Sequence, residues 1–162
     1  MIAIDLIDLY DPLLKNRDTS LRFITHPNDS NNLNFWPLWA AKEAAFKLQR
    51  TKQPFRPKTI NIQFDSENTF QYHGLKGNIY QSEDWVISTL GDQKIEYVTF
   101  DVETDDPSTE IRKKIKEWFF ENHQINTFVS SDKSGLPILN HNQSPISITH
   151  HGRFMAFAYL PE

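Results

Sequence analysis

The stretch WAAKEAAFK at residues 39–47 places charged side chains in a segment that otherwise favours a plain apolar helix. In a helix, Trp39, Glu43 and Lys47 are spaced by four and share one stripe, whereas Lys42 lies about 100° round from Glu43. The simplest interpretation is a surface Glu–Lys pair, which contributes about 0.2–0.5 kcal/mol to helix stability. The tryptophan on the same stripe favours the alternative that the stripe lines a cleft.

A second candidate is Asp5, within the apolar run IAIDLIDLY at residues 2–10. A buried carboxylate is costly unless a cation or several donors meet it, so Asp5 is either paired with a lysine or bound to a metal ion. Strand alternation puts Asp5 and Asp8 on opposite faces, so the two cannot share one ion. A carboxylate from elsewhere, for which Glu43 is eligible, would complete an oxygen-only ligand set that favours Mg²⁺.

His150 and His151 stand side by side near the C-terminus. Neighbours on a strand point to opposite faces, so we do not expect both rings to bind one zinc ion. Because His150 continues the face of Ile146 and Ile148, a histidine of the core or of a strand end is its plain alternative. The sequence contains neither a G-x-S-x-G elbow nor a glycine-rich phosphate loop, which argues against nucleophilic hydrolases and P-loop enzymes.

The elements that would position these residues follow from the hydrophobic patterning. Helices are expected at 12–24, from the cap Asn34 to about Gln49, and at 108–122 with Ser108 or Thr109 as its cap. Strands are expected at 2–10, then as a meander at 59–64, 69–74, 85–90 and 95–100, then near 125–130 and as a closing pair around 145–159. The pattern predicts an α+β fold with an antiparallel sheet packed against helices, in one domain over residues 1–162 with an enlarged region at about 55–124.

The composition is that of a folded protein, with 38% hydrophobic and 13% aromatic residues. The absence of cysteine excludes disulfides and thiolate metal sites. Acids interrupt the N-terminal apolar run and no run approaches the roughly 20 apolar residues of a membrane helix, so we expect a soluble, cytoplasmic protein without a signal peptide. A net charge of −4 argues against a general nucleic-acid binder, although the basic cluster between residues 42 and 58 suits a small polyanion or an acidic partner.

Three of these segments together resemble the 4'-phosphopantetheinyl transferase superfamily. Its motif W-x-x-K-E-[AS]-x-x-K is complete here as Trp39, Lys42, Glu43, Ala44 and Lys47. Its metal-binding strand, G-[IVT]-D-[IV], is similar to AIDL at residues 3–6, and its G-x-P and S-[IL]-[ST]-H blocks are similar to residues 135–137 and 147–150. The order of the motifs is similar to the short holo-[acyl-carrier-protein] synthase branch, which implies a half-module of the transferase fold.

Two positions depart from the family pattern. Ala3 stands where the family usually has glycine, which is a mild change in extended backbone. Ile7 stands where the longer branch of the family tends to have a third carboxylate ligand. The resemblance therefore implies a metal ion held by two protein carboxylates and more water.

The resemblance implies an Mg²⁺-dependent transfer of the phosphopantetheine arm of coenzyme A to a serine of an apo acyl or peptidyl carrier protein, with release of adenosine 3',5'-bisphosphate. It assigns Asp5 and Glu43 to the metal, Glu43 and Lys47 to catalysis, and Lys42, Lys47 and His150 to coenzyme A. Magnesium would bridge pyrophosphate oxygens and offset charge on the leaving phosphate. Either Glu43 or a water on the metal ion would take the serine proton, and the sequence does not choose between them.

The short branch also implies a mode of assembly. With one half-module per chain, we expect a homo-oligomer, dimer or trimer, in which His150 completes the Asp5–Glu43 site of a neighbouring subunit. Carrier proteins of this family are acidic, so basic residues near the site are candidates for steering them, namely Lys15, Arg17, Arg22, Arg50 and Lys52. The identity of the carrier, and with it the fatty-acid, polyketide or peptide pathway, stays open.

Two other functions explain part of the sequence. A catalytically silent family member would bind a carrier protein or coenzyme A without transfer, although such a module has little need for both Asp5 and Glu43. A β-domain for single-stranded nucleic acid would use the basic and aromatic stretch RTKQPFRPK at residues 50–58. The second interpretation leaves Asp5 and the charged helix unexplained.

Overall fold

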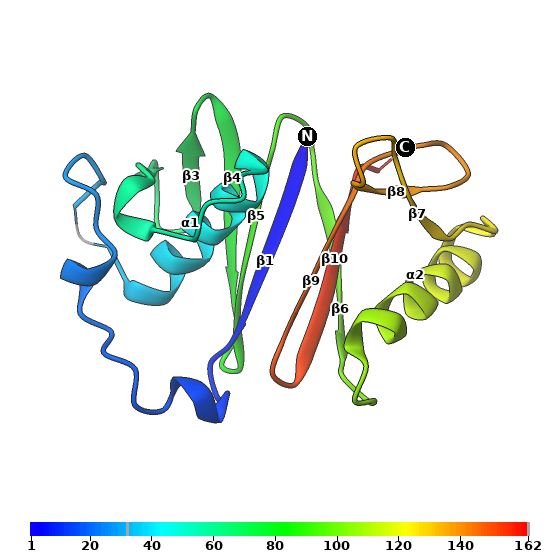
Figure 1. The fold of residues 1–162 in the computed structure, drawn as a ribbon, viewed down its shortest axis with the longest axis horizontal. Helices are drawn as coiled ribbons and strands as arrows, with labels where there is room; N and C mark the ends of the chain where they lie inside the picture. Colours follow the sequence, from blue (N-terminus) through cyan, green and yellow to red (C-terminus); the bar gives the residue numbers. More distant parts are fainter. Residues whose placement is uncertain (32, 162) are drawn as a thin grey trace.

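Two antiparallel sheets lie side by side, and one long helix packs on each of them (Figure 1). The computed structural model describes residues 1–31 and 33–161. The five-stranded sheet has the order β1-β5-β4-β3-β2, the three-stranded sheet has the order β6-β10-β9, and β7 and β8 form a separate pair. The helices and strands are β1 (Ile2–Asp8), α1 (Phe35–Gln49), β2 (Gln63–Phe64), β3 (Thr69–Tyr72), β4 (Leu75–Gln81), β5 (Trp85–Gly91), β6 (Glu96–Asp101), α2 (Pro107–His123), β7 (Val129–Ser131), β8 (Pro137–Leu139), β9 (Ile146–His151) and β10 (Phe154–Tyr159).

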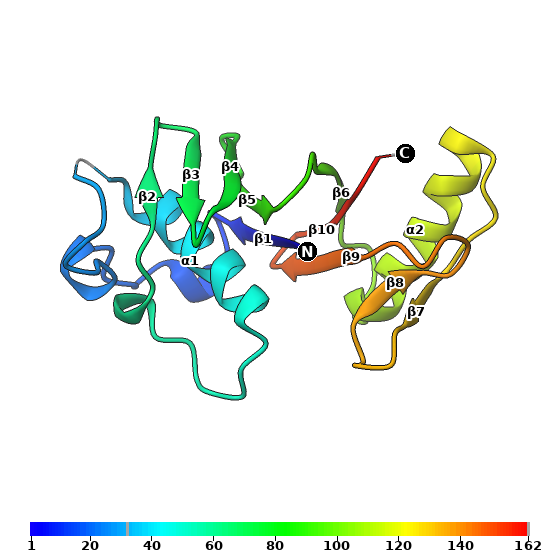
Figure 2. The ribbon, with the colours of Figure 1, turned by 90° about the horizontal axis from the view of Figure 1, so that it is seen from above.

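The first sheet and α1 form the N-terminal half, and the second sheet with α2, β7 and β8 forms the C-terminal half (Figure 2). The predicted α+β class, with antiparallel sheets packed against helices, is confirmed. None of the helices in the described part of the chain is long and apolar enough to cross a membrane.

Helix α1 occupies the range that the sequence predicts. Asn34 stands at its N-cap with extended backbone, and Pro37 lies in the first turn, where a missing N–H does no harm. The helix ends where Arg50 adopts a left-handed conformation with a φ of 52°. Its alanines and Leu38 are fully buried against residues of the first sheet, among them Ala3.

Helix α2 covers the three-stranded sheet, which gives a role to the predicted helix at 108–122. Its cap is Asp106, whose Oδ1 accepts a hydrogen bond from the Thr109 N–H at 3.1 Å, so the predicted caps Ser108 and Thr109 are wrong by two or three residues. On the buried face, Ile111 and Ile115 belong to one apolar cluster with Phe157 and Tyr159 of β10.

The predicted helix at 12–24 is wrong. This segment contains two short 3₁₀ turns, Pro12–Leu14 and Leu21–Phe23. Local hydrogen bonds replace helical ones: Asp11 accepts from the Leu13 N–H, and Asp18 accepts from the Ser20 N–H. Leu13 is 88% exposed, whereas Ile24 is buried and Leu14 and Leu21 pack against the core, so the apolar residues of the segment are buried from two short turns and not from one continuous helix.

The sequence pattern does not predict strand β4. It follows a two-residue turn at His73 and Gly74, whose φ angles of 47° and 79° suit the tight hairpin that joins β3 to β4. The pattern LKGNIYQ has few β-branched residues, so the strand is specified mainly by the turn before it and by its pairing with β3 and β5.

The two sheets meet where β1 lies beside β9, at the centre of the molecule in Figure 1. Both are edge strands of their sheets. Side chains of β9 accept hydrogen bonds from edge amides of β1: the Ile4 N–H donates to Ser147 Oγ at 3.1 Å, and the Asp8 N–H donates to His151 Nδ1 at 2.9 Å. These two N–H groups of the edge strand therefore have hydrogen-bond acceptors although β1 and β9 do not pair through their backbones. The junction also places β9 next to Asp5.

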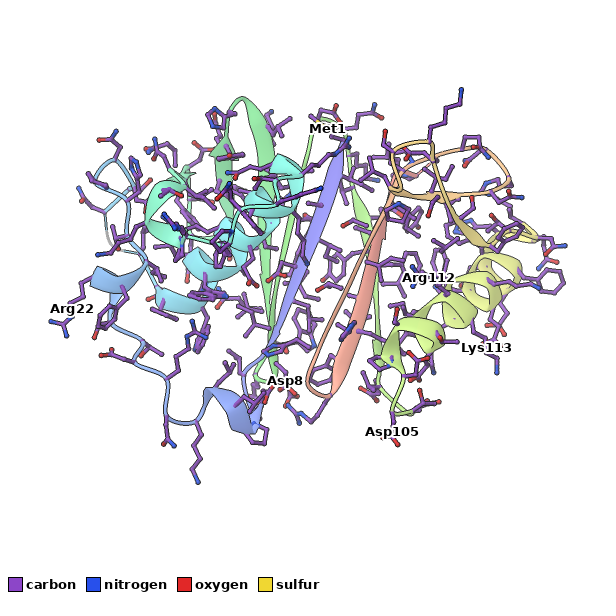
Figure 3. All side chains as sticks on the ribbon, viewed as in Figure 1. Met1, Asp8, Arg22, Asp105, Arg112 and Lys113 are labelled. Atoms are coloured by element: carbon purple, nitrogen blue, oxygen red, sulfur yellow. The ribbon has the colours of Figure 1, made fainter. Side chains whose placement is uncertain are left out.

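The lower end of this junction is fixed by Asp8, labelled in Figure 3. Its buried carboxylate accepts hydrogen bonds from the backbone N–H and the guanidinium of Arg153 and from the Tyr10 N–H, at 2.9–3.0 Å. Gly152 has a φ of 54°, and a Cβ there would come within 2.5 Å of Asp8 Oδ2. The turn between β9 and β10 thus requires glycine and closes on the end of β1.

Candidate active site

A cavity of about 760 Å³ lies between the two halves of the chain. Its charged and titratable lining residues are Lys47 and Arg50 at the end of α1, Arg112 on α2, His150 on β9, and Asp132. Its apolar lining includes Ile2, Leu48, Ile138 and Ile146. Figure 3 labels Arg112 on α2, in the half opposite Lys47 and Arg50. The basic groups on both walls and the apolar surface between them suit a ligand that combines several anionic groups with apolar parts.

Lys47 links this cavity to Asp5. Its ammonium lies 2.8 Å from Asp5 Oδ1, 2.8 Å from the Ile4 carbonyl oxygen and 3.2 Å from Thr149 Oγ1. The Asp5 side chain is 5% exposed and the Lys47 side chain 36%, so the lysine is the group that reaches the cavity wall. The lysine partner that the sequence left open for Asp5 is present, and it comes from the predicted helix.

The second oxygen of Asp5 is short of a partner. Asp5 Oδ2 is buried, and while Glu43 is ionised no donor within residues 1–31 and 33–161 forms a hydrogen bond with it. Glu43 lies beside it: burial, the charge of Asp5 and a hydrogen bond between the two side chains raise the pKa of Glu43 to about 8, against the opposing effects of Lys47 and the Trp39 indole. Only the Lys47 ammonium pairs with this carboxylate pair, through Asp5, so when Asp5 and Glu43 are both ionised the described site carries an uncompensated negative charge.

These residues fit a hard divalent cation. Mg²⁺ binds oxygen ligands, and an unpartnered buried carboxylate oxygen next to a second carboxylate offers it two. The described residues contain no group of three or more histidine, aspartate or glutamate side chains placed to hold a metal ion. The expectation, based on Ile7, that water and ligand oxygens would supply the remaining positions stays a prediction.

The structure does not bring Lys42 to this site. Its side chain is fully buried, and its ammonium donates to Asp29 Oδ2 at 2.6 Å and to the carbonyl oxygens of Pro57 and Ile60 at 3.0 and 2.6 Å. All three N–H groups are therefore used. The predicted contact of Lys42 with coenzyme A stays a prediction, although in this structure helix geometry buries the side chain: Lys42 stands one turn after the buried Leu38.

His150 lines the same cavity as Lys47 of its own chain. It is exposed near the end of β9, so the core alternative is wrong and the strand-end alternative remains. The motif order predicts that it completes the site of a neighbouring subunit. Because β9 lies beside β1 within one chain, the structure brings His150 to the Lys47 side of the cavity without a second subunit.

Three residues of this region were not assigned a role at the site from the sequence. Thr149 contacts Lys47, and its only signal is its place inside the S-[IL]-[ST]-H block. Arg112 has no sequence signal, because the position of α2 depends on long-range packing. Arg50, expected to steer a carrier, instead lines the cavity.

The other basic candidates lie away from the cavity lining. Arg17 places its guanidinium 4.0 Å from the centre of the Trp39 ring, and Arg22 lies at the outer edge of the N-terminal half in Figure 3. Lys15 and Lys52 are exposed. These four residues could meet a partner only on the surface of the N-terminal half.

One of three comparisons with known proteins gives a match. A family model, the 4'-phosphopantetheinyl transferase superfamily, matches residues 15–98, which is slightly more than half of the chain. The match includes Glu43 and Lys47 and stops short of Asp5 and His150. A search of curated proteins and a search of solved structures returned no significant match.

Proposed function

The chain belongs to the 4'-phosphopantetheinyl transferase superfamily, and from this membership we propose that it transfers the phosphopantetheine arm of coenzyme A to a serine of an apo acyl or peptidyl carrier protein. The observation that carries the proposal is the meeting of Asp5, Glu43 and Lys47 at the edge of a basic cavity. A protein that only bound the ligand would have no need for a buried and a half-buried carboxylate side by side with one ammonium bonded to Asp5.

Asp5 and Glu43 would hold the magnesium ion. When bound, Mg²⁺ neutralises the paired carboxylates and stabilises negative charge on the pyrophosphate during transfer. Asp5 can bind the cation and Lys47 at the same time, because Lys47 donates to Oδ1 and leaves Oδ2 available for the cation.

Lys47 and the cavity would bind coenzyme A. The ammonium of Lys47 offers a point charge to the pyrophosphate, and its bond to Thr149 holds it between the two halves. His150 and the two arginines of the cavity supply further positive or hydrogen-bonding groups, and the apolar lining can accept the uncharged parts of the ligand.

In the reaction, the oxygen of the carrier serine bonds to the phosphorus that bears the pantetheine arm. The bond from this phosphorus to the oxygen of adenosine 3',5'-bisphosphate breaks, and the serine loses its proton to a base. Glu43 is the protein carboxylate beside the site, and either Glu43 or a water next to it would take the proton.

We also propose that one chain holds a complete site. His150, Lys47, Asp5 and Glu43 come from β9, α1 and β1 of the same chain, and the Lys47–Thr149 bond crosses between the halves. The expected homo-oligomer and the cytoplasmic location stay predictions. If subunits do associate, they would do so without exchanging these residues.

The test is the intact mass of an apo acyl carrier protein after incubation with the full chain, coenzyme A and Mg²⁺. We expect the mass to rise by one phosphopantetheine group, and the increase to disappear with a chelator or with the Glu43→Ala variant. A peptidyl carrier protein should be tried in parallel. If neither type gains mass although coenzyme A binds, the protein is instead a silent binding member of the family.

A further inference from the structure

Ser88 on β5 stands directly opposite Asp5 on β1 in the antiparallel register. Side chains of such a pair point to the same face of the sheet, with Cβ atoms about 5 Å apart. The next residues along that face of β5, Val86 and Leu90, belong to the same buried cluster as Ala3 and the core of α1. The Ser88 hydroxyl and the Asp5 carboxylate therefore lie together on the face that α1 covers.

Both groups contain a buried atom without a partner. Ser88 is 0% exposed, and its Oγ forms no hydrogen bond with any residue that the structure describes; the same holds for Asp5 Oδ2 while Glu43 is ionised, as Glu43 is when it binds a cation. Leaving a buried polar group unpaired costs about 1–3 kcal/mol, so two such atoms on one cross-strand pair require an explanation. Their chemistry is complementary, because a hydroxyl can donate and a carboxylate oxygen accepts.

We propose that Ser88 is a positioning residue for the metal-binding carboxylate of Asp5. When a divalent cation is held by Asp5 and Glu43, the Ser88 hydroxyl donates a hydrogen bond to the Asp5 carboxylate or to a water beside it. This bond fixes the orientation in which the carboxylate presents its oxygen to the cation. The inference rests on the metal site of the proposed function and adds to it a residue from a strand that carries none of the family motifs.

A neighbouring residue provides a matched control. Thr89 is also fully buried with an unpartnered hydroxyl among the described residues, but strand alternation turns it to the opposite face. There its register partner is Ile4, and Ile4 and Ile87 belong to a separate apolar cluster. The two hydroxyls thus lie on the same strand, are both buried and both lack a hydrogen-bond partner among the described residues. They differ because Ser88 faces Asp5 and Thr89 does not.

The experiment is a titration of the metal-free full chain with Mn²⁺, followed by the electron paramagnetic resonance signal of the free ion. Removing a hydrogen-bond partner of a metal ligand typically weakens metal binding about 10- to 100-fold. We therefore expect Ser88→Ala to weaken Mn²⁺ binding at least about ten-fold, while Thr89→Val binds like the wild type. Ser88→Cys keeps the size and provides a weaker donor, so it should also bind Mn²⁺ more weakly than the wild type.

Thermal unfolding of the metal-free variants gives a second readout. An idle buried hydroxyl can be removed without loss, so Ser88→Ala should melt at or above the wild-type temperature although it binds the ion less well. Equal Mn²⁺ affinity in Ser88→Ala and wild type would overturn the inference and leave the proposed function intact. Equal weakening by Ser88→Ala and Thr89→Val would also overturn it, because the effect would then be one of packing. A wild type that binds no Mn²⁺ would overturn the metal site itself, and the inference with it.

Discussion

Asp5 and Asp8 are two buried aspartates of one strand, and they are surrounded in opposite ways. Both oxygens of Asp8 accept hydrogen bonds from Arg153, and Tyr10 adds a backbone donor. Burial alone would raise the pKa of Asp8, but these donors lower it to about 2. Asp5 has a lysine on one oxygen, no partner on the other among the described residues, and a second carboxylate beside it.

The difference separates a structural carboxylate from a reactive one. A carboxylate that holds elements together is saturated with donors, because each missing bond would cost stability. A carboxylate that must bind a ligand is left short of donors, and the ligand supplies the missing interaction. The two residues are also linked, since the Asp8 end fixes the β9–β10 turn and so keeps Thr149 within reach of Lys47.

The largest effect should come from removing the charge of Asp5. Asp5→Asn keeps the size and can still accept from Lys47, so the free energy of unfolding should change by less than about 1 kcal/mol. Loss of one metal carboxylate should lower kcat/KM for carrier modification by about 10³-fold. The free energy of unfolding and kcat/KM should be measured on the same preparation. A large loss of stability in a variant that still modifies the carrier would show that Asp5 is a structural carboxylate like Asp8.

The same substitution at Asp8 should lower stability strongly and transfer activity only slightly. Asp8→Asn removes charge-assisted bonds to Arg153, so we expect the free energy of unfolding to fall by about 2–3 kcal/mol at pH 7. Because its folded pKa is depressed, the contribution of Asp8 is present above pH 4 and is lost as the pH falls toward 2. Urea unfolding at several pH values would show this, and transfer per folded molecule should stay within a few-fold of wild type. An unchanged unfolding midpoint would contradict the structural role.

The raised pKa of Glu43 predicts a stability change of the opposite sign. In the metal-free protein, Glu43 is protonated in the folded state up to about pH 8, whereas its ordinary pKa is 4.5. Its contribution to stability is therefore fully present below pH 4.5 and is lost as the pH rises to about 8.

Glu43→Gln removes this dependence. Relative to wild type, the variant should gain about 1.4 kcal/mol of unfolding free energy for each pH unit between about 5 and 8, and the difference should level off above that. Denaturant unfolding in the presence of a chelator measures it. Parallel pH profiles for the two proteins would mean that Glu43 is not held beside an ionised Asp5.

The last prediction is that mixing two inactive variants has no effect on transfer activity. A mixture of Glu43→Ala and His150→Ala chains should recover no transfer activity beyond the sum of the separate variants, because each chain carries both residues of its own site. Recovery at matched mixing would show that the site forms between subunits, as the motif order alone suggests. A mixture of wild type with either variant serves as the control for inhibition by mixing.

Much of the site can be predicted from local spacing. The stripe of Trp39, Glu43 and Lys47 depends only on the helical repeat, and the separation of Asp5 from Asp8 depends only on strand alternation. The same helical geometry contains a signal that Lys42 is buried, since it follows Leu38 by one turn. The family resemblance led instead to a predicted ligand contact, whereas in the structure the Lys42 ammonium bonds to Asp29.

What the sequence determined by itself is the set of elements and the faces on which they present their residues, because these follow from interactions between near neighbours in the chain. The tertiary structure decided which faces meet. It placed β9 beside β1 so that one chain holds His150 and Lys47, and it set the register that puts Ser88 opposite Asp5. Some of these pairings join residues that are more than a hundred positions apart in the chain. They depend on how whole sheets pack against each other, and no local sequence pattern encodes that packing.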